Sequence, residues 1–218
     1  MPRGAVSSAT GHRVHRDRSL WWAGPVTVYV VSHPEVHVDP TVPVPRWGLS
    51  GAGHERLEHL LALPWAQTLT RVVSSTEVKA VQTAEALAAP LGLVVLLDEE
   101  LGENDRSSTG FVPPSEFEEL ADAFFAHPSI SVRGWETAEH AQARFTAAVR
   151  RQLEGATGDV AVVAHGGVGT LMLCQLLGVP VDRALDQPGQ GSWYAFEQVS
   201  GVVYHGWRRI GPQRSTSR

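Results

Sequence analysis

The 218-residue sequence contains one cysteine, Cys174, so it has no internal disulfide framework and no four-cysteine zinc site. This scarcity of cysteine is typical of a reducing compartment. No stretch reaches the roughly 18 apolar residues that a membrane-spanning helix needs. Residues 20–31 follow several arginines in the manner of a signal peptide, but Pro25 interrupts the run and no small-residue cleavage site follows. The sequence therefore predicts a cytoplasmic protein without a membrane anchor.

Lysine is almost missing as well: Lys79 is the only lysine beside 17 arginines. The net charge of −5 is unevenly distributed, with +3 on residues 1–25 and +4 on residues 207–218, which leaves −12 on residues 26–206. Nucleic-acid binding requires clustered positive charge at phosphate contacts. The acidic central part therefore argues against a nucleic-acid partner.

Apolar runs alternate with helical patterns along most of the chain. Continuous apolar strands between helices indicate a parallel sheet that is covered on both faces. The predicted fold class is α/β, with three layers and a mostly parallel sheet. One domain is expected over residues 25–210, between a poorly ordered arm at 1–24 and a disordered tail at 211–218. Residues 101–135 break the alternation and are expected to form a cap over one end of the sheet.

Periodicity and turn residues predict the individual elements. The expected strands are 26–31, 71–74, 93–97, 159–164, 192–196 and 202–207, with the last two paired as an antiparallel hairpin at an edge. The expected helices are about 51–63, 78–88, 137–154 and one that ends at Leu177. Ser50 and Ser75 are expected as helix N-caps, and the capping box from Ser115 to Glu118 is expected to open a short helix in the cap.

Chemically active residues follow four of the predicted strands. His33 comes directly after the first strand and His165 after the strand 159–164, while Lys79 and Glu103 follow the two strands between them. Ligands of parallel α/β sheets bind beyond the carboxyl ends of the strands. Two imidazoles, an ammonium and a carboxylate at one rim suit phosphoryl transfer, in which a histidine attacks phosphorus and an acid protonates the leaving oxygen. The helix that begins at Gly166 adds backbone N–H groups for an anion.

Five short motifs make the sequence resemble the histidine phosphatase superfamily, which has the phosphoglycerate-mutase-like fold. The resemblance covers about residues 26–207. Three of the family motifs are R-H-G-E, L-[ST]-x-x-G and S-x-x-x-R-A-x-Q-T-A, and two more are L-x-E and V-x-H-G-G. They correspond, in the same order, to Ser32-His33-Pro34-Glu35, Leu49-Ser50-x-x-Gly53, Ser75-x-x-x-Lys79-Ala80-x-Gln82-Thr83-Ala84, Leu101-x-Glu103 and Val163-x-His165-Gly166-Gly167.

The resemblance implies roles for the matching residues. His33 would be the phosphorylated nucleophile, and His165 would donate to the phosphoryl oxygens. Glu103 would protonate the leaving group and later activate water, although the position of this acid varies within the family. Gly166 would contribute to phosphate binding at the helix N-terminus. No metal and no cofactor is implied.

The sequence departs from the family pattern in the phosphate pocket. Ser32 replaces the arginine before the nucleophile; its hydroxyl can hydrogen-bond phosphate but brings no charge. Lys79 replaces the second arginine and would bind phosphate with its charge but without bidentate geometry. Arg46, in a proline-flanked loop, is a candidate replacement or an exposed loop cation. Arg106 is a second candidate.

Two functions remain open at this point. The first is a metal-independent phosphomonoester hydrolase that acts through phosphohistidine on a small phosphorylated metabolite. The alternative is a catalytically weak or inactive family member that binds a phospholigand or has a regulatory role. Phosphatase is favoured over mutase because the cap at 101–135 is short and poor in basic residues. The substrate and the oligomeric state are not readable from the sequence.

Overall fold

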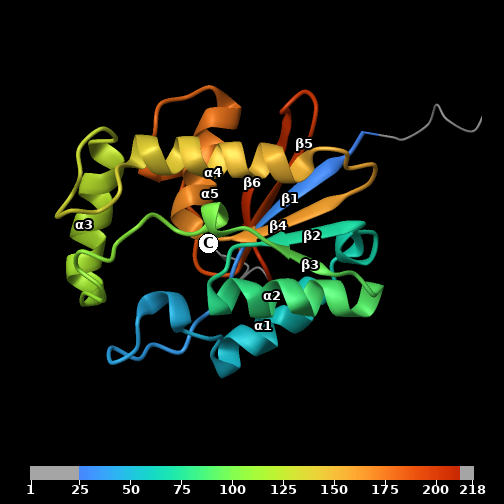
Figure 1. The fold of residues 1–218 in the computed structure, drawn as a ribbon, viewed down its shortest axis with the longest axis horizontal. Coiled ribbons are helices and arrows are strands. Elements are labelled where there is room, and N and C mark those ends of the chain that lie inside the picture. Colours follow the sequence, from blue (N-terminus) through green and yellow to red (C-terminus); the bar gives the residue numbers. More distant parts are fainter. Residues whose placement is uncertain (1–24, 212–218) are drawn as a thin grey trace, which may run out of the picture.

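The computed structural model describes residues 25–211, so the predicted arm at 1–24 and the tail from 212 lie outside the described residues. A six-stranded sheet forms the centre of the protein, in the strand order β3-β2-β4-β1-β5-β6 (Figure 1). The strands are β1 (Thr27–Ser32), β2 (Arg71–Ser74), β3 (Val95–Leu97), β4 (Val160–Ala164), β5 (Ser192–Glu197) and β6 (Val203–Arg209).

The first four strands are parallel, as predicted. β4 pairs with β1 on one side and with β2 on the other, and β2 pairs with β3. The pairing places Ser32 beside Ala164 and Ser74 beside Val163, so three neighbouring strands end at nearly the same level. The antiparallel hairpin of β5 and β6 continues the sheet from β1 to the edge, which confirms the predicted hairpin.

Helices cover both faces of the sheet (Figure 1). One face packs against α1 (Gly51–Leu61) and α2 (Val78–Ala88), and the other against α4 (Ala138–Leu153) and α5 (Gly166–Leu177). β4 is buried along its whole length because it lies inside the sheet and under helices on both sides. This arrangement confirms the predicted three-layer α/β class.

The segment between β3 and α4 forms the cap, with α3 (Pro114–Ala126) standing beside one end of the sheet (Figure 1). The predicted capping box is wrong, because α3 begins at Pro114 after the N-cap position Pro113, which places Ser115 inside the first turn. Proline at the first helical position fits since no intrahelical partner exists for its missing N–H. Among residues 25–211, no helix has both the length and the apolar character to cross a membrane.

Candidate active site

The two histidines are brought together by neighbouring parallel strands. His33 follows β1 and His165 follows β4, and the backbone N–H of His33 donates to the Ala164 carbonyl at 3.2 Å. Their rings lie edge to face with centroids 5.3 Å apart. The third strand end belongs to β2, where the Ser75 N–H donates to the Val163 carbonyl. The predicted rim of active residues is therefore built by strand register, with α2 and α5 leading away from it.

His33 is held in one tautomer by the main chain. Its Nδ1 lies 2.8 Å from the carbonyl oxygen of Pro34. A carbonyl can only accept, so Nδ1 carries the proton and Nε2 keeps a free lone pair. Burial lowers the pKa of His33 to about 4, and the positive charges of Lys79 and Arg106 act in the same direction. The ring is therefore neutral at ordinary pH, as a nucleophilic imidazole must be.

His165 is almost completely buried, and its Nε2 has two oxygen neighbours. Ser75 Oγ lies at 2.8 Å and Glu77 Oε1 at 3.3 Å from Nε2, while Nδ1 has no hydrogen-bond partner among the described residues. A carboxylate only accepts, so Nε2–H is the donor. Burial lowers the pKa of His165 well below its usual value, against the opposing charge of Glu77. The prediction that Ser75 caps α2 is wrong: the N-cap is Glu77, and Ser75 contacts the histidine.

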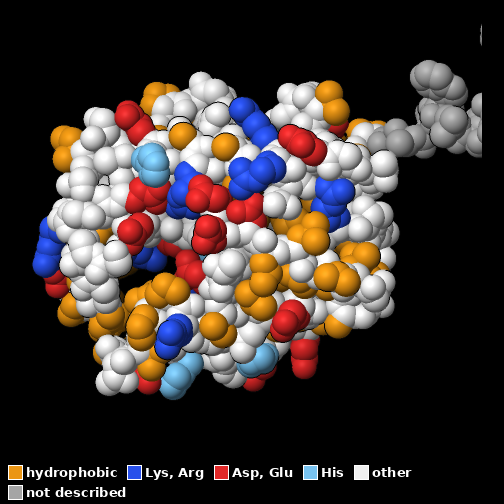
Figure 2. Space-filling view, in the orientation of Figure 1, with side chains coloured by type: hydrophobic (Ala, Val, Ile, Leu, Met, Phe, Trp, Pro, Cys, Tyr) orange, Lys and Arg blue, Asp and Glu red, His pale blue; other side chains and the backbone are white. Residues whose placement is uncertain are grey.

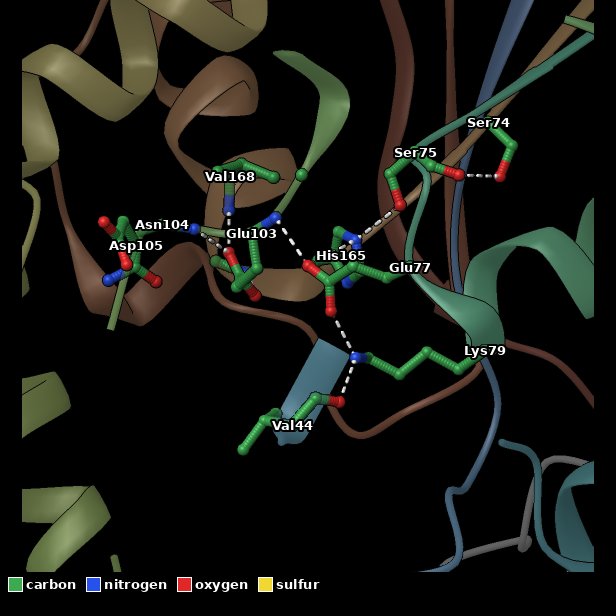
Figure 3. A network of polar contacts seen from close by, with 12 residues as sticks. Val44, Ser74, Ser75, Glu77, Lys79, Glu103, Asn104, Asp105, His165 and Val168 are labelled. Atoms are coloured by element: carbon green, nitrogen blue, oxygen red, sulfur yellow. Dashed lines mark hydrogen bonds and ion pairs between the residues drawn. The ribbon is translucent and has the colours of Figure 1, made fainter. Parts of the chain in front are cut away.

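Lys79 lies inside the site and forms a buried ion pair with Glu77 (Figure 3). Its ammonium also donates to the carbonyl of Val44 at 3.0 Å, which joins α2 to the turn Val44–Arg46. Burial alone would raise the pKa of Glu77, but His165 and Lys79 outweigh it and lower this pKa to about 2. The single lysine of the chain thus has its charge neutralised by a carboxylate two residues earlier.

Glu103 lies at the N-terminus of α5, directly beyond His165 (Figure 3). Its carboxylate accepts from the N–H groups of Gly167 at 3.2 Å and Val168 at 3.0 Å, and from its neighbour Asn104. A helix N-terminus has unsatisfied donors and a positive dipole end, which favour an anion there. The N–H of Glu103 in turn donates to Glu77 Oε1 at 3.1 Å, so the two carboxylates belong to one network.

Ser32 and Gly166 lie on the β5 side of the histidines. The buried hydroxyl of Ser32 donates to the Gln187 side chain and accepts from the Ser192 N–H at 3.0 Å. Gly166 leaves room for Gln187, because a Cβ on this glycine would lie 2.0 Å from the Gln187 Nε2. The hydroxyl that replaces the family arginine therefore helps to hold a carboxamide against the first residue of α5.

The two candidate replacement arginines differ in position. Arg46 is exposed in the turn Val44–Arg46, and within residues 25–211 its guanidinium forms no hydrogen bond or ion pair. Arg106 is half-buried, and its guanidinium lies 5.1 Å from the centroid of the Phe117 ring and 5.6 Å from that of Trp135. Its charge contributes to lowering the pKa of both histidines. The geometry thus favours Arg106 over Arg46 as the second cation near the site.

The surface is hollowed between α3 and the segment that joins β1 to α1, and charged side chains of both signs gather around the hollow (Figure 2). Trp47 is buried along this segment and contacts Phe111 of the cap, with ring centroids 5.7 Å apart. Among residues 25–211, no three His, Cys, Asp or Glu side chains are grouped so that they could hold a metal ion.

Sequence reasoning missed Glu77 and Gln187. Glu77 occupies a variable position of the motif between Ser75 and Lys79, and its spacing two residues before the unusual lysine was the only available signal. Gln187 lies in an irregular segment between α5 and β5, where no periodicity predicts which side chains turn inward.

The family model of the histidine phosphatase superfamily, branch 1, matches residues 43–201. This match covers well over half of the chain, and it begins ten residues after His33. No curated protein matches the sequence at a significant level.

Solved structures of similar fold are numerous. A mycobacterial glucosyl-3-phosphoglycerate phosphatase superposes with a TM-score of 0.69 at 21% identity, covering 86% of this chain and all of that one. The protein YhfR from Bacillus stearothermophilus superposes with a TM-score of 0.65 at 22% identity, over 83% and 95% of the two chains. The alpha-ribazole phosphatase from Shigella flexneri gives 0.61 at 19% identity, over 86% and 100%. With the family match and this shared fold, the chain belongs to the histidine phosphatase superfamily.

Proposed function

We propose that the protein is a metal-independent phosphomonoester hydrolase that acts through a phosphohistidine on a small phosphorylated metabolite. The observation that carries this proposal is the state of His33: a neutral ring whose Nδ1–H is bound to Pro34, so that Nε2 is free to attack. Membership of a phosphatase superfamily supports the same class of reaction.

In the first step, Nε2 of His33 attacks phosphorus and the bond from phosphorus to the ester oxygen breaks. The leaving oxygen takes up a proton from Glu103, the acid candidate beside the first turn of α5. The Nε2–H of His165 and the ammonium of Lys79 donate to the phosphoryl oxygens as negative charge develops on them. Both groups contact the Glu77 carboxylate.

In the second step, Glu103 accepts a proton from water, whose oxygen attacks phosphorus. The bond between phosphorus and Nε2 breaks, which releases phosphate and restores neutral His33. Glu103 therefore acts first as an acid and then as a base, and each cycle consumes one water molecule.

The half-buried Arg106 and the aromatic side chains of the cap are proposed to contact the part of the substrate that leaves. Arg106 is held between Phe117 and Trp135, so its guanidinium is positioned without a carboxylate partner among the described residues. The structural relatives named as phosphatases of glucosyl-3-phosphoglycerate and alpha-ribazole make small phosphorylated metabolites the first compounds to test.

The test is phosphate release from p-nitrophenyl phosphate and from a panel of metabolite phosphates, in the presence of a chelator. We expect turnover by the wild type, and a loss of at least about a thousandfold in His33→Ala, because the nucleophile is absent. His37→Ala is the matched control, since His37 is exposed on the following segment. Equal rates for the wild type and His33→Ala would reject the proposal, as would activity that disappears on chelation.

One observation favours the second candidate, a weakly active or inactive phospholigand-binding protein. Ser32 brings no charge to the pocket, and the charge of Lys79 is already paired with Glu77. This candidate predicts that inorganic phosphate binds to the purified protein while no compound of the panel is hydrolysed.

A further inference from the structure

The side chain of Glu77 spans the two groups to which the proposed function assigns phosphoryl binding. One carboxylate oxygen pairs with the ammonium of Lys79, and the other lies 3.3 Å from Nε2 of His165 (Figure 3). The latter oxygen also accepts from the Glu103 N–H at 3.1 Å. A carboxylate therefore lies where the equatorial oxygens of a bound phosphoryl group would be held.

This carboxylate is built into the site and is not a surface side chain that folds over it. The exposed fraction of the side chain is 13% for Glu77, 5% for Lys79 and 1% for His165. The groups that face it are His165 from the end of β4, Lys79 from α2 and the main chain of Glu103, with His33 and Arg106 close enough to interact through their charges.

The charges of this network sum to zero. Lys79 contributes one positive charge and Glu77 one negative charge, and both histidines are neutral at ordinary pH because burial lowers each pKa. A doubly charged phosphoryl group would thus enter a site without net positive charge and would lie against an ionised carboxylate. Two like charges in one site are unfavourable unless a proton is shared between them.

We propose that Glu77 makes the site selective for the singly charged form of the phosphoryl group, whose remaining P–O–H donates to the Glu77 carboxylate. This inference rests on the proposed function, because it assumes that Lys79 and His165 hold the phosphoryl oxygens. The second pKa of a phosphomonoester is near 6. The singly charged form therefore dominates below about pH 6 and is lost above it.

Glu77 and the two histidines of the site keep their charge in this pH window. The pKa of Glu77 is about 2, because His165 and Lys79 outweigh its burial, and the pKa of His33 is about 4. Neither group changes its charge between about pH 5 and about pH 8. A change in phosphate affinity over this range then reports the ionisation of the phosphate itself.

The experiment measures the binding of inorganic phosphate by titration calorimetry at about pH 5 and about pH 8. For the wild type we expect the affinity to fall about five- to tenfold, because inorganic phosphate loses its second proton near pH 7, about one unit above a phosphomonoester. For Glu77→Gln we expect a change of less than about threefold, because a neutral amide does not repel the doubly charged ion. Glu85→Gln, an exposed change on the same helix α2, should behave like the wild type.

A second measurement needs no variant. Sulfate resembles phosphate in shape and stays doubly charged at both pH values, so it should bind the wild type at least about tenfold more weakly than phosphate does at about pH 5. Equal binding of the two ions at that pH overturns the inference. It is also overturned if Glu77→Gln strengthens binding equally at both pH values, because Glu77 would then be displaced by the ligand and not share its proton.

These outcomes are separate from those of the proposed function. Phosphate binding with the expected pH dependence, but without turnover of any ester, supports the inference while the hydrolase proposal fails. Turnover that depends on His33, together with a wild-type affinity independent of pH, leaves the hydrolase and removes the role of Glu77. An absence of phosphate binding to both the wild type and Glu77→Gln overturns the inference.

Discussion

Two carboxylates lie beside His33 and His165, and the protein surrounds them in different ways. Glu103 accepts hydrogen bonds from backbone N–H groups at the start of α5, where a helix stabilises an anion without any ionised partner. Glu77 is held by the side chains of Lys79 and His165, and it neutralises the charge of Lys79, which the proposed function assigns to phosphoryl binding.

This difference suits the two carboxylates to different roles in the proposed reaction, one in proton transfer and one in the choice of anion. The surroundings of Glu103 are made of main chain, so they depend on where α5 begins and on the lack of a Cβ at Gly167, which would lie 2.8 Å from Glu103 Oε1. The surroundings of Glu77 depend on a single lysine, the only one in the sequence. The first carboxylate is thus suited to a constant role in proton transfer, and the second to adjusting which anion enters.

The largest expected effect is on turnover when the same substitution is made at each carboxylate. Glu103→Gln should lower kcat for a phosphate ester of an alcohol by about 10²- to 10⁴-fold, because an amide cannot donate a proton to the leaving alkoxide or accept one from water. Glu77→Gln should keep most of its activity and gain relative activity above about pH 6. Glu100→Gln, exposed in the turn before Glu103, is the control. Unchanged kcat in Glu103→Gln would remove Glu103 from the mechanism.

Loss of the partner of Glu77 and loss of Glu103 itself should also differ in their effect on the free energy of unfolding, and this difference is smaller than the difference in kcat. Lys79→Met leaves the buried Glu77 without its ion-pair partner, which should lower the free energy of unfolding by about 3–5 kcal/mol. Glu103→Ala should cost only about 1 kcal/mol, as expected for the loss of acceptors at a helix N-terminus. Denaturant unfolding measures both. If adding Glu77→Gln to Lys79→Met recovers none of the loss, the buried charge is not its cause.

Acid should weaken the Glu77 network, with an effect of about 3 kcal/mol at most. The pKa of Glu77 falls from the usual 4.5 to about 2 in the folded protein, where His165 and Lys79 outweigh its burial. Between these values the unfolded chain binds a proton that the folded protein does not, so stability is present above about pH 4.5 and is lost as the pH falls toward 2. Urea unfolding across this range should show a shallower loss in Glu77→Gln than in Glu85→Gln, and equal slopes contradict the prediction.

The parts of the fold that depend on periodicity and on strand ends were predictable. Apolar runs predicted the parallel strands, and the positions of His33 and His165 directly after two of them predicted that the histidines meet. Parallel strands that pair in register must end at one rim, so the sequence order was sufficient for this conclusion.

The details that depend on local competition between hydrogen bonds were not predictable. Ser75 has the residue type of an N-cap, but in the folded chain its hydroxyl lies at the His165 ring and α2 begins three residues later. Ser115 fits a capping box, but Pro113 and Pro114 set the start of α3. The same holds for Lys79. The sequence predicted its position in the motif, but its pairing with Glu77 depends on where the first turn of α2 directs the two side chains.

The hydrogen bond from His33 to its own neighbouring carbonyl has a consequence for the regiochemistry of the proposed intermediate. Either nitrogen of an imidazole can attack phosphorus, and in free histidine no neighbouring chain determines which of the two reacts. Here Nδ1–H donates a hydrogen bond to the Pro34 carbonyl, so only the Nε2-phosphorylated isomer can form without breaking this bond. The backbone carbonyl of Pro34, directly after the proposed nucleophile, would thus determine which nitrogen of His33 is phosphorylated.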